Sequence, residues 1–183
     1  MTLPLTTQAE ANTRRWLERI VVGLNLCPFA ASPFKRERIA YRVSEGTTLE
    51  SVYRDVLAAA DELLNGDPSE IETTLVIAPN ALHTFDEYLE ALALIEQALG
   101  QAGLDGILQV ASFHPDYCFD GVAQDDPANH TNRSPHPMFH LIREAGLAAA
   151  LESYPDADGI PERNVELLRK LGIDEIRRLL ELS

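Results

Sequence analysis

Residues 113–144 hold most of the side chains in this sequence that could do chemistry. The segment contains four of the five histidines and one of the two cysteines, together with several aspartates and two arginines. It lies between an apolar run that predicts a strand and an amphipathic run that predicts a helix, a position where α/β proteins hold reactive groups on a rigid frame. We therefore expect any functional site to be built from this segment.

The first part of the segment has the residue types that ligate zinc and similar divalent ions. His114, Asp116 and Cys118 occur at every second position, and on a strand this spacing places all three on one face. Pro115 interrupts such a strand, and in the alternative interpretation the aspartates form turns while Cys118 packs in the core. The three residues are candidate ligands for a divalent metal, and the cofactor is otherwise unknown.

The second part, residues 129–137, concentrates polar donors just ahead of the predicted helix. The first turn of a helix has unsatisfied backbone amides, so its start attracts anions, and an arginine beside it adds a planar partner for phosphate or carboxylate. Alternatively, the arginine pairs internally with Asp125 or Asp126, and Ser134 only caps the helix. The candidates for binding a small anionic substrate are Asn129, Asn132, Arg133, Ser134 and Arg143.

On the predicted helix itself, His140, Arg143 and Glu144 share one polar face. If this face looks into a cleft, His140 can act as a general acid or base oriented by Glu144. If it faces solvent, the same residues form an ion-pair surface without chemistry. Together with His114 and Asp116, His140 completes the set of candidate catalytic residues.

The elements that position these groups alternate between strand and helix. Residues 37–113 contain three apolar strand-like runs separated by two amphipathic helices, each of which begins at a Thr-x-x-Glu capping motif. Right-handed crossovers would make the strands parallel and bring their C-terminal ends to one edge. We expect an α/β fold: a small, mainly parallel sheet of three or more strands with a βαβαβ core, flanked by helices.

Residues 1–183 are expected to form one domain around this core. A helix occupies 1–27, the polar functional loop spans 114–136, and extra C-terminal helices fill 137–183, with the first at 137–154. Cys27 precedes Pro28 at a helix C-terminus, where the dipole disfavours a thiolate, so we interpret it as a small buried hydrophobe.

Charge and length exclude several classes of protein. The 183-residue chain has a net charge of −14 and is acidic, which disfavours nucleic acid and anionic membranes as partners. Two cysteines make no disulfide framework, the N-terminus does not resemble a signal peptide, and no apolar run approaches the roughly 20 residues that span a bilayer. We expect a cytoplasmic protein, and a homo-oligomer through the last two helices is compatible with the sequence.

Three segments carry a resemblance to a known family. They are residues 22–30, 113–119 and 129–144, the last of which contains the distinctive Asn-His-Thr-Asn-Arg-Ser-Pro block. In these segments the chain resembles the bacterial proteins grouped as domain of unknown function 1415, over nearly its whole length. The resemblance implies a single intracellular bacterial domain and carries no established reaction.

Two hypotheses of function follow. In the first, the protein is an enzyme that acts on a phosphate- or carboxylate-bearing small molecule by His/Asp acid–base chemistry, with or without a metal. In the second, it is a binding or assembly module, and the polar loop is an internally satisfied brace.

Overall fold

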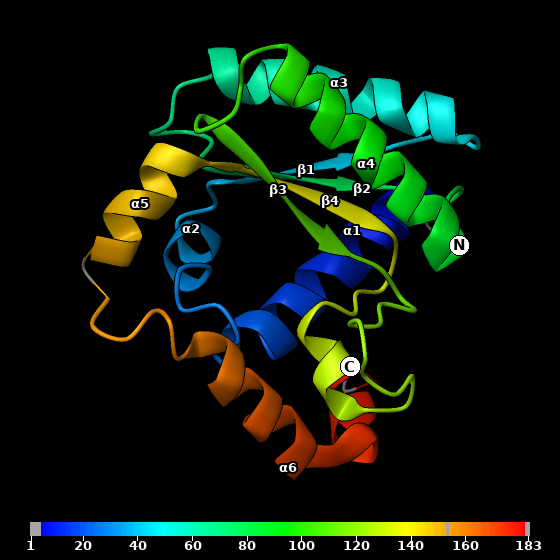
Figure 1. The fold of residues 1–183 in the computed structure, drawn as a ribbon, viewed down its shortest axis with the longest axis vertical. Helices are drawn as coiled ribbons and strands as arrows, with labels where there is room; N and C mark the ends of the chain where they lie inside the picture. The colour runs from blue at the N-terminus through cyan, green and yellow to red at the C-terminus, as the bar shows by residue number, and fades with distance from the viewer. Residues whose placement is uncertain (1–4, 153, 182–183) are drawn as a thin grey trace.

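A computed structural model describes residues 5–152 and 154–181. At its centre lies a four-stranded sheet in the order β1-β2-β4-β3, in which β1 and β2 are parallel and β4 is antiparallel to both of its neighbours (Figure 1). The strands are β1 (Ile39–Val43), β2 (Thr73–Ile77), β3 (Leu108–Phe113) and β4 (Met138–Arg143).

Two layers of helices cover the sheet. One face packs against α3 (Leu49–Asn65) and α4 (Phe85–Gln101), and the other packs against helices from both ends of the chain (Figure 1). These are α1 (Leu5–Trp16), its continuation as the π-helix η1 (Leu17–Val22), and α6 (Ile160–Glu181). The shorter helices are α2 (Ala31–Lys35), the 3₁₀-helix η2 (Pro127–Thr131) and α5 (Glu144–Glu152).

The three strands of the predicted βαβαβ core run in the same direction, as expected. Strands β1, β2 and β3 all run the same way, because β1 is parallel to β2, and β4 is antiparallel to both β2 and β3. Thr84 caps α4 with Glu87 as predicted, whereas α3 uses Thr48 and Ser51, one residue later than the predicted motif. The C-terminal ends of the three strands therefore lie at one edge of the sheet, beside the polar loop.

The prediction of a helix over 137–154 is wrong in its first part. Residues 138–143 form β4, which inserts between β2 and β3 and makes the sheet mixed rather than mainly parallel. The helix begins only at Glu144. The run Met-Phe-His-Leu-Ile is rich in residues that favour a buried strand, and burial between two strands outweighs the helical spacing of its polar residues.

The C-terminal helices are confirmed, with a break between them. Gly172 adopts φ 74°, a left-handed conformation that favours glycine, and divides α6 into two helical parts. The sequence predicts the last two helices over 161–171 and 174–182, and the break lies between these two ranges. It lets the second part turn so that Ile176 is buried in the same core as Leu168.

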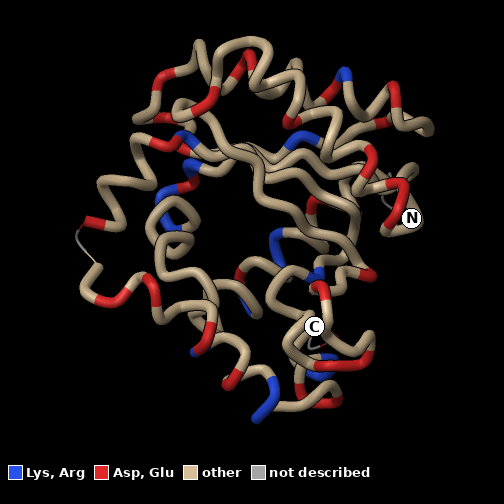
Figure 2. The backbone as a smooth tube through the Cα atoms, viewed as in Figure 1, with Lys and Arg blue, Asp and Glu red and all other residues tan. Residues whose placement is uncertain are grey.

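The charged surface follows the composition. Acidic positions are spread over helices on both sides of the sheet (Figure 2). Within residues 5–152 and 154–181, no helix has both the length and the apolar character needed to cross a membrane.

One tyrosine joins the two strands that flank the polar loop. The Tyr88 hydroxyl donates to the carbonyl of Met138 at 2.7 Å and accepts from the amide of Phe113 at 3.1 Å. The side chain is fully buried on α4. It therefore fixes the end of β3 and the start of β4, the two points between which the polar loop runs.

Removing this hydroxyl should destabilise the fold. For Tyr88→Phe we expect a loss of about 1–3 kcal/mol in the free energy of unfolding, because a buried amide and a buried carbonyl lose their partner. Urea unfolding followed by the fluorescence of the single tryptophan measures it. Tyr53→Phe is the matched control, since that hydroxyl makes no hydrogen bond to a described residue. Equal stability of the two variants would contradict the bridging role.

Candidate functional site

His114 is buried inside the protein and both of its ring nitrogens are engaged. Nε2 lies 3.0 Å from the carbonyl of Leu82, and Nδ1 accepts from the amide of Asp116 at 3.0 Å. Burial is the main cause that lowers the pKa of His114. The imidazole is therefore neutral at pH 7 and links the end of β3 to the start of α4.

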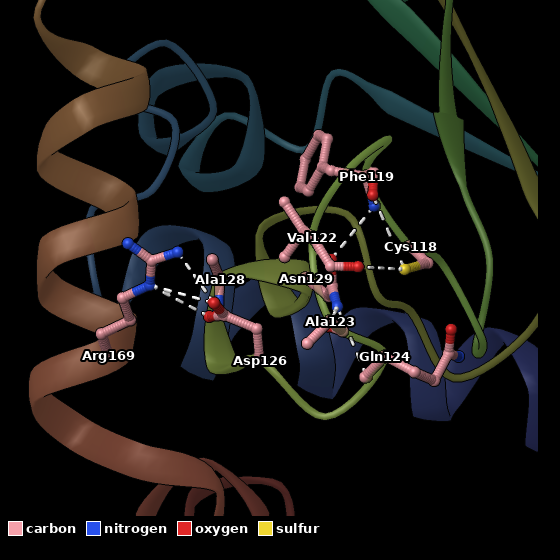
Figure 3. Close-up of polar contacts among 9 residues, drawn as sticks. All are labelled: Cys118, Phe119, Val122, Ala123, Gln124, Asp126, Ala128, Asn129 and Arg169. Carbon is pink, nitrogen blue, oxygen red and sulfur yellow. Dashed lines mark hydrogen bonds and ion pairs between the residues drawn. The ribbon is translucent and has the colours of Figure 1, made fainter.

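The two asparagines of the predicted anion site are also bonded to the backbone. Asn129 is fully buried; its Oδ1 accepts from the amide of Phe119 at 3.1 Å and its Nδ2 donates to the carbonyl of Ala123 at 2.8 Å (Figure 3). Asn132 donates to the carbonyl of Ser112 at 3.0 Å. Both side chains hold the loop in place.

Arg133 was expected either to bind an anion or to pair with Asp125 or Asp126. In the part of the chain that the structure describes, it pairs with neither aspartate, and only part of its guanidinium is free. Its Nε donates to the carbonyl of Tyr117 at 3.0 Å and its Nη2 to that of Gln124 at 2.7 Å, so part of the guanidinium braces the loop. Asp126 pairs instead with Arg169 on α6 at 2.8 Å (Figure 3). Only Nη1 of Arg133 is left without a partner among the described residues.

The predicted helix start is absent from this loop, so it supplies no ring of free amides. Ser134 donates through its hydroxyl to the carbonyl of His136 at 2.6 Å, and the chain continues into β4. Arg143 lies at the opposite end of the sheet, paired with Leu108 at the start of β3. Its Nη2 donates to the carbonyls of Leu63 and Gly66, where it closes the end of α3.

The metal-ligand candidates do not converge. Asp116 is exposed, and the Cys118 thiol donates to the carbonyl of Val122 at 3.3 Å. In the part of the chain that the structure describes, no three His, Cys, Asp or Glu side chains lie close enough together to hold a metal ion.

The structure instead contains a large cavity on the other face of the sheet. It has a volume of about 620 Å³ and lies between β2, β3 and β4, the α1–η1 helix, the 27–33 segment and α5. We call it the sheet cavity. Its walls are mostly apolar, and they include Trp16, Leu17, Val21, Leu75, Phe113, Ile142 and Leu147.

Of the candidate residues, Arg143 and His140 line this cavity. The side chain of His140 is held by the neighbouring strand β2. Its Nε2 lies 2.6 Å from the hydroxyl oxygen of Thr73, and that hydroxyl donates to the carbonyl of Leu141 at 2.6 Å. Nε2 must therefore carry the proton, which leaves Nδ1 as an acceptor with no partner among the described residues. Burial lowers the pKa of His140 to about 4, so the ring is neutral at pH 7.

The structure separates the two histidines expected to act together. The His114 ring contacts Phe85 and Tyr88 on the α4 side of the sheet, whereas the His140 ring contacts Phe113 and lines the cavity on the other side. The two histidines do not line a common cavity. Of the predicted catalytic residues, only His140 reaches the cavity.

Cys27 also lies in the cavity wall. Burial raises the pKa of its thiol and outweighs the hydrogen bonds from the backbone of Phe29 and Ala30, which lower it. The thiol is protonated at neutral pH and packs against the core, in agreement with its interpretation as a small hydrophobe. It precedes α2 after a turn, rather than lying at the end of a helix as predicted.

Sequence reasoning missed Thr73 and Trp16 as parts of a site. Thr73 begins a buried strand, and Trp16 belongs to the apolar stripe of the first helix, so both fit a packed core. The available signal was the polar histidine within the apolar Met-Phe-His-Leu-Ile run. On a strand, that histidine needs a polar partner on the same face.

The comparison with protein families gives a match over nearly the whole chain. Residues 8–178 match the model of a family described as "Protein of unknown function (DUF1415)". No curated protein and no solved structure matches the chain.

Asn129 tests the bracing role of the loop. For Asn129→Ala we expect a loss of about 1–3 kcal/mol in the free energy of unfolding, because the buried Phe119 amide and Ala123 carbonyl lose their partner. Thermal or urea unfolding measures it. Asn80→Ala, whose side chain makes no hydrogen bond to a described residue, is the control. An Asn129→Ala protein as stable as this control would show that the loop does not need the brace.

His140 should make stability depend on pH. Its folded pKa of about 4 lies below the unfolded value of about 6.5, so the unfolded chain binds more protons between these pH values. The contribution of His140 to the free energy of unfolding is therefore complete above about pH 6.5. It is lost as the pH falls towards 4, and the loss is on the order of 3 kcal/mol. His140→Gln should reduce this loss relative to wild type in urea unfolding at each pH, whereas the exposed His83→Gln should not. Parallel profiles for wild type and His140→Gln would refute the assignment.

Proposed function

We propose that this chain, which belongs to the DUF1415 family of proteins of unknown function, binds a small and mainly apolar molecule in the sheet cavity. The observation that carries the proposal is the size of the cavity. Protein interiors are close-packed and contain few voids larger than a water molecule. A space of about 620 Å³ lies within the range of roughly 300–1,000 Å³ that is typical of ligand pockets.

The cavity also has a defined polar point. The Thr73 hydroxyl holds the ring of His140 through Nε2 and thereby leaves Nδ1 available. A neutral imidazole nitrogen in an apolar wall accepts one hydrogen bond. We therefore infer a ligand with an apolar body and a hydroxyl, an amide N–H or another uncharged donor near His140.

The α5 helix is suited to admit the ligand. None of its residues is buried, although most are alanine, leucine or glycine, and it lines one side of the cavity. A helix with so little packing opens at a low cost in free energy. Entry beside α5 requires no rearrangement of the sheet.

An acid–base enzyme is the second candidate, supported by the free Nδ1 of His140 at the cavity wall. Catalysis by a general base is most efficient when its pKa lies near the working pH. The pKa of about 4 makes His140 a weak base at pH 7. Binding is therefore the better supported function, with His140 as a hydrogen-bonding anchor.

Dye binding tests the cavity directly. Nile red, a neutral apolar dye, should bind wild type saturably with a rise in its fluorescence. Ile142→Trp, which places a larger side chain in the cavity wall, should weaken binding about tenfold or more by occupying the space. Measurement is by titration of the dye at fixed protein concentration.

Leu94→Trp is the matched control, because Leu94 is exposed on α4 in the opposite layer. It adds the same ring without touching the cavity and should leave dye affinity unchanged. Absence of saturable binding to wild type, or equal affinities of wild type and a folded Ile142→Trp protein, would overturn the proposal.

A further inference from the structure

A second cleft lies between α1, the 130–135 segment and the end of α6. Its volume is about 300 Å³, and we call it the basic cleft. Its lining residues are Asn12, Arg15, Trp16, Pro115, His130, Arg133, Ser134, Pro135 and Leu180. None of these residues is acidic, although the chain has 29 acidic residues and only 15 basic ones.

The arginines at this cleft lack carboxylate partners. Arg15 and Arg133 line it, and the charge of Arg177 on α6 acts on His130 within it. Within the described part of the chain, none of the three forms an ion pair, whereas Arg14, Arg42, Arg169 and Arg178 each do. Like charges gathered in this way repel one another unless an anion lies between them.

His130 registers this positive charge. Burial first, and then the charges of Arg133 and Arg177, together lower its pKa to about 4. Arg15, on the helix that closes the cleft, adds a third positive group. The carboxylate of Asp126, the N-cap residue of the short helix that carries His130, is already paired with Arg169.

Several hydrogen-bond donors of the cleft are free and held in place. Two bonds to backbone carbonyls fix the Arg133 guanidinium and leave Nη1 available. Asn12 accepts from Gln8 through Oδ1, so its Nδ2 can still donate. Neither nitrogen of His130, and no guanidinium nitrogen of Arg15, has a partner among the described residues. The donors held in place on Arg133 and Asn12 favour an oxyanion with several acceptors.

We propose that the basic cleft binds the phosphate group of a small phosphorylated molecule. Phosphate offers two negative charges and several acceptor oxygens, which suits three unpaired arginines better than a single carboxylate does. The apolar side chains of Trp16, Pro115 and Leu180 line the same cleft. A nucleic acid is disfavoured because the whole chain carries a charge of −14. This phosphate site is a different site from the one proposed in the sheet cavity, and it takes a different ligand.

Inorganic phosphate is the probe for the test. In an NMR titration of the histidine ring signals, phosphate should raise the pKa of His130 from about 4 towards its ordinary value, since a bound anion favours the imidazolium. Sodium chloride at the same ionic strength is the control for screening. A shift with chloride equal to that with phosphate would overturn the proposal.

Charge variants then locate the site by calorimetric titration with phosphate. Arg15→Gln and Arg177→Gln each remove one exposed arginine without disturbing the loop brace, and each should weaken phosphate binding about tenfold. Arg54→Gln removes the same charge from an exposed position on α3 and should have no effect beyond that of net charge. Loss of affinity in Arg54→Gln equal to that in Arg15→Gln would reject the cleft as the site.

The proposals for the sheet cavity and for the basic cleft can be tested independently of each other. Ile142→Trp should abolish dye binding and leave phosphate affinity unchanged, whereas Arg15→Gln should do the reverse. Phosphate binding without dye binding would remove only the function proposed for the sheet cavity. Dye binding without phosphate binding would remove only the basic cleft.

Discussion

Strand β4 pairs along its length with β2 on one side and with β3 on the other. Because it is antiparallel to β3, the chain must leave the C-terminal edge of the sheet and return to the same edge. The segment that does so lies outside the sheet, so its backbone groups are satisfied partly by turns of its own backbone and partly by side chains. His114, Asn129 and Arg133 supply the side-chain partners. The polar character of residues 114–136 is therefore largely a consequence of this topology.

The same strand decides what each face of the sheet contains. Alternation places Phe139 and Leu141 in the core beneath α3 and α4, whereas Met138, His140 and Ile142 face the helices from the chain ends. Two long helices fill the first face. The second face is covered by pieces from distant parts of the chain, which enclose the sheet cavity. A histidine on this face therefore borders open space, while Thr73 satisfies one of its nitrogens.

The local elements were predictable, and the long-range pairing was not. Thr84 with Glu87 and Gly172 are local signals, and they mark the limits of helices as the physics of capping and backbone conformation requires. Pro28 was a weaker guide, because the first helical segment ends at Val22, before the proline is reached. Residues 138–143 were assigned to a helix because polar side chains recur there at helical spacing. The apolar composition of this run favours a strand locally, but the position between β2 and β3 that the strand fills depends on long-range pairing, which the local sequence does not show. The candidate site had the same weakness, since its arginine and histidines were grouped by nearness in sequence.

Trp16 is the one structural element that the two sites have in common. It lines both the sheet cavity and the basic cleft, and its ring packs edge-on against Phe113 at 5.3 Å. Its indole N–H is buried without a partner among the described residues, so this side chain can shift without breaking a hydrogen bond. A ligand that binds at one proposed site without moving Trp16 leaves the wall of the other site unchanged, whereas a ligand that displaces the ring alters that wall. Any such coupling must be reciprocal, because each ligand alters the affinity for the other by the same factor. The position of a single apolar ring therefore determines whether the two sites act independently.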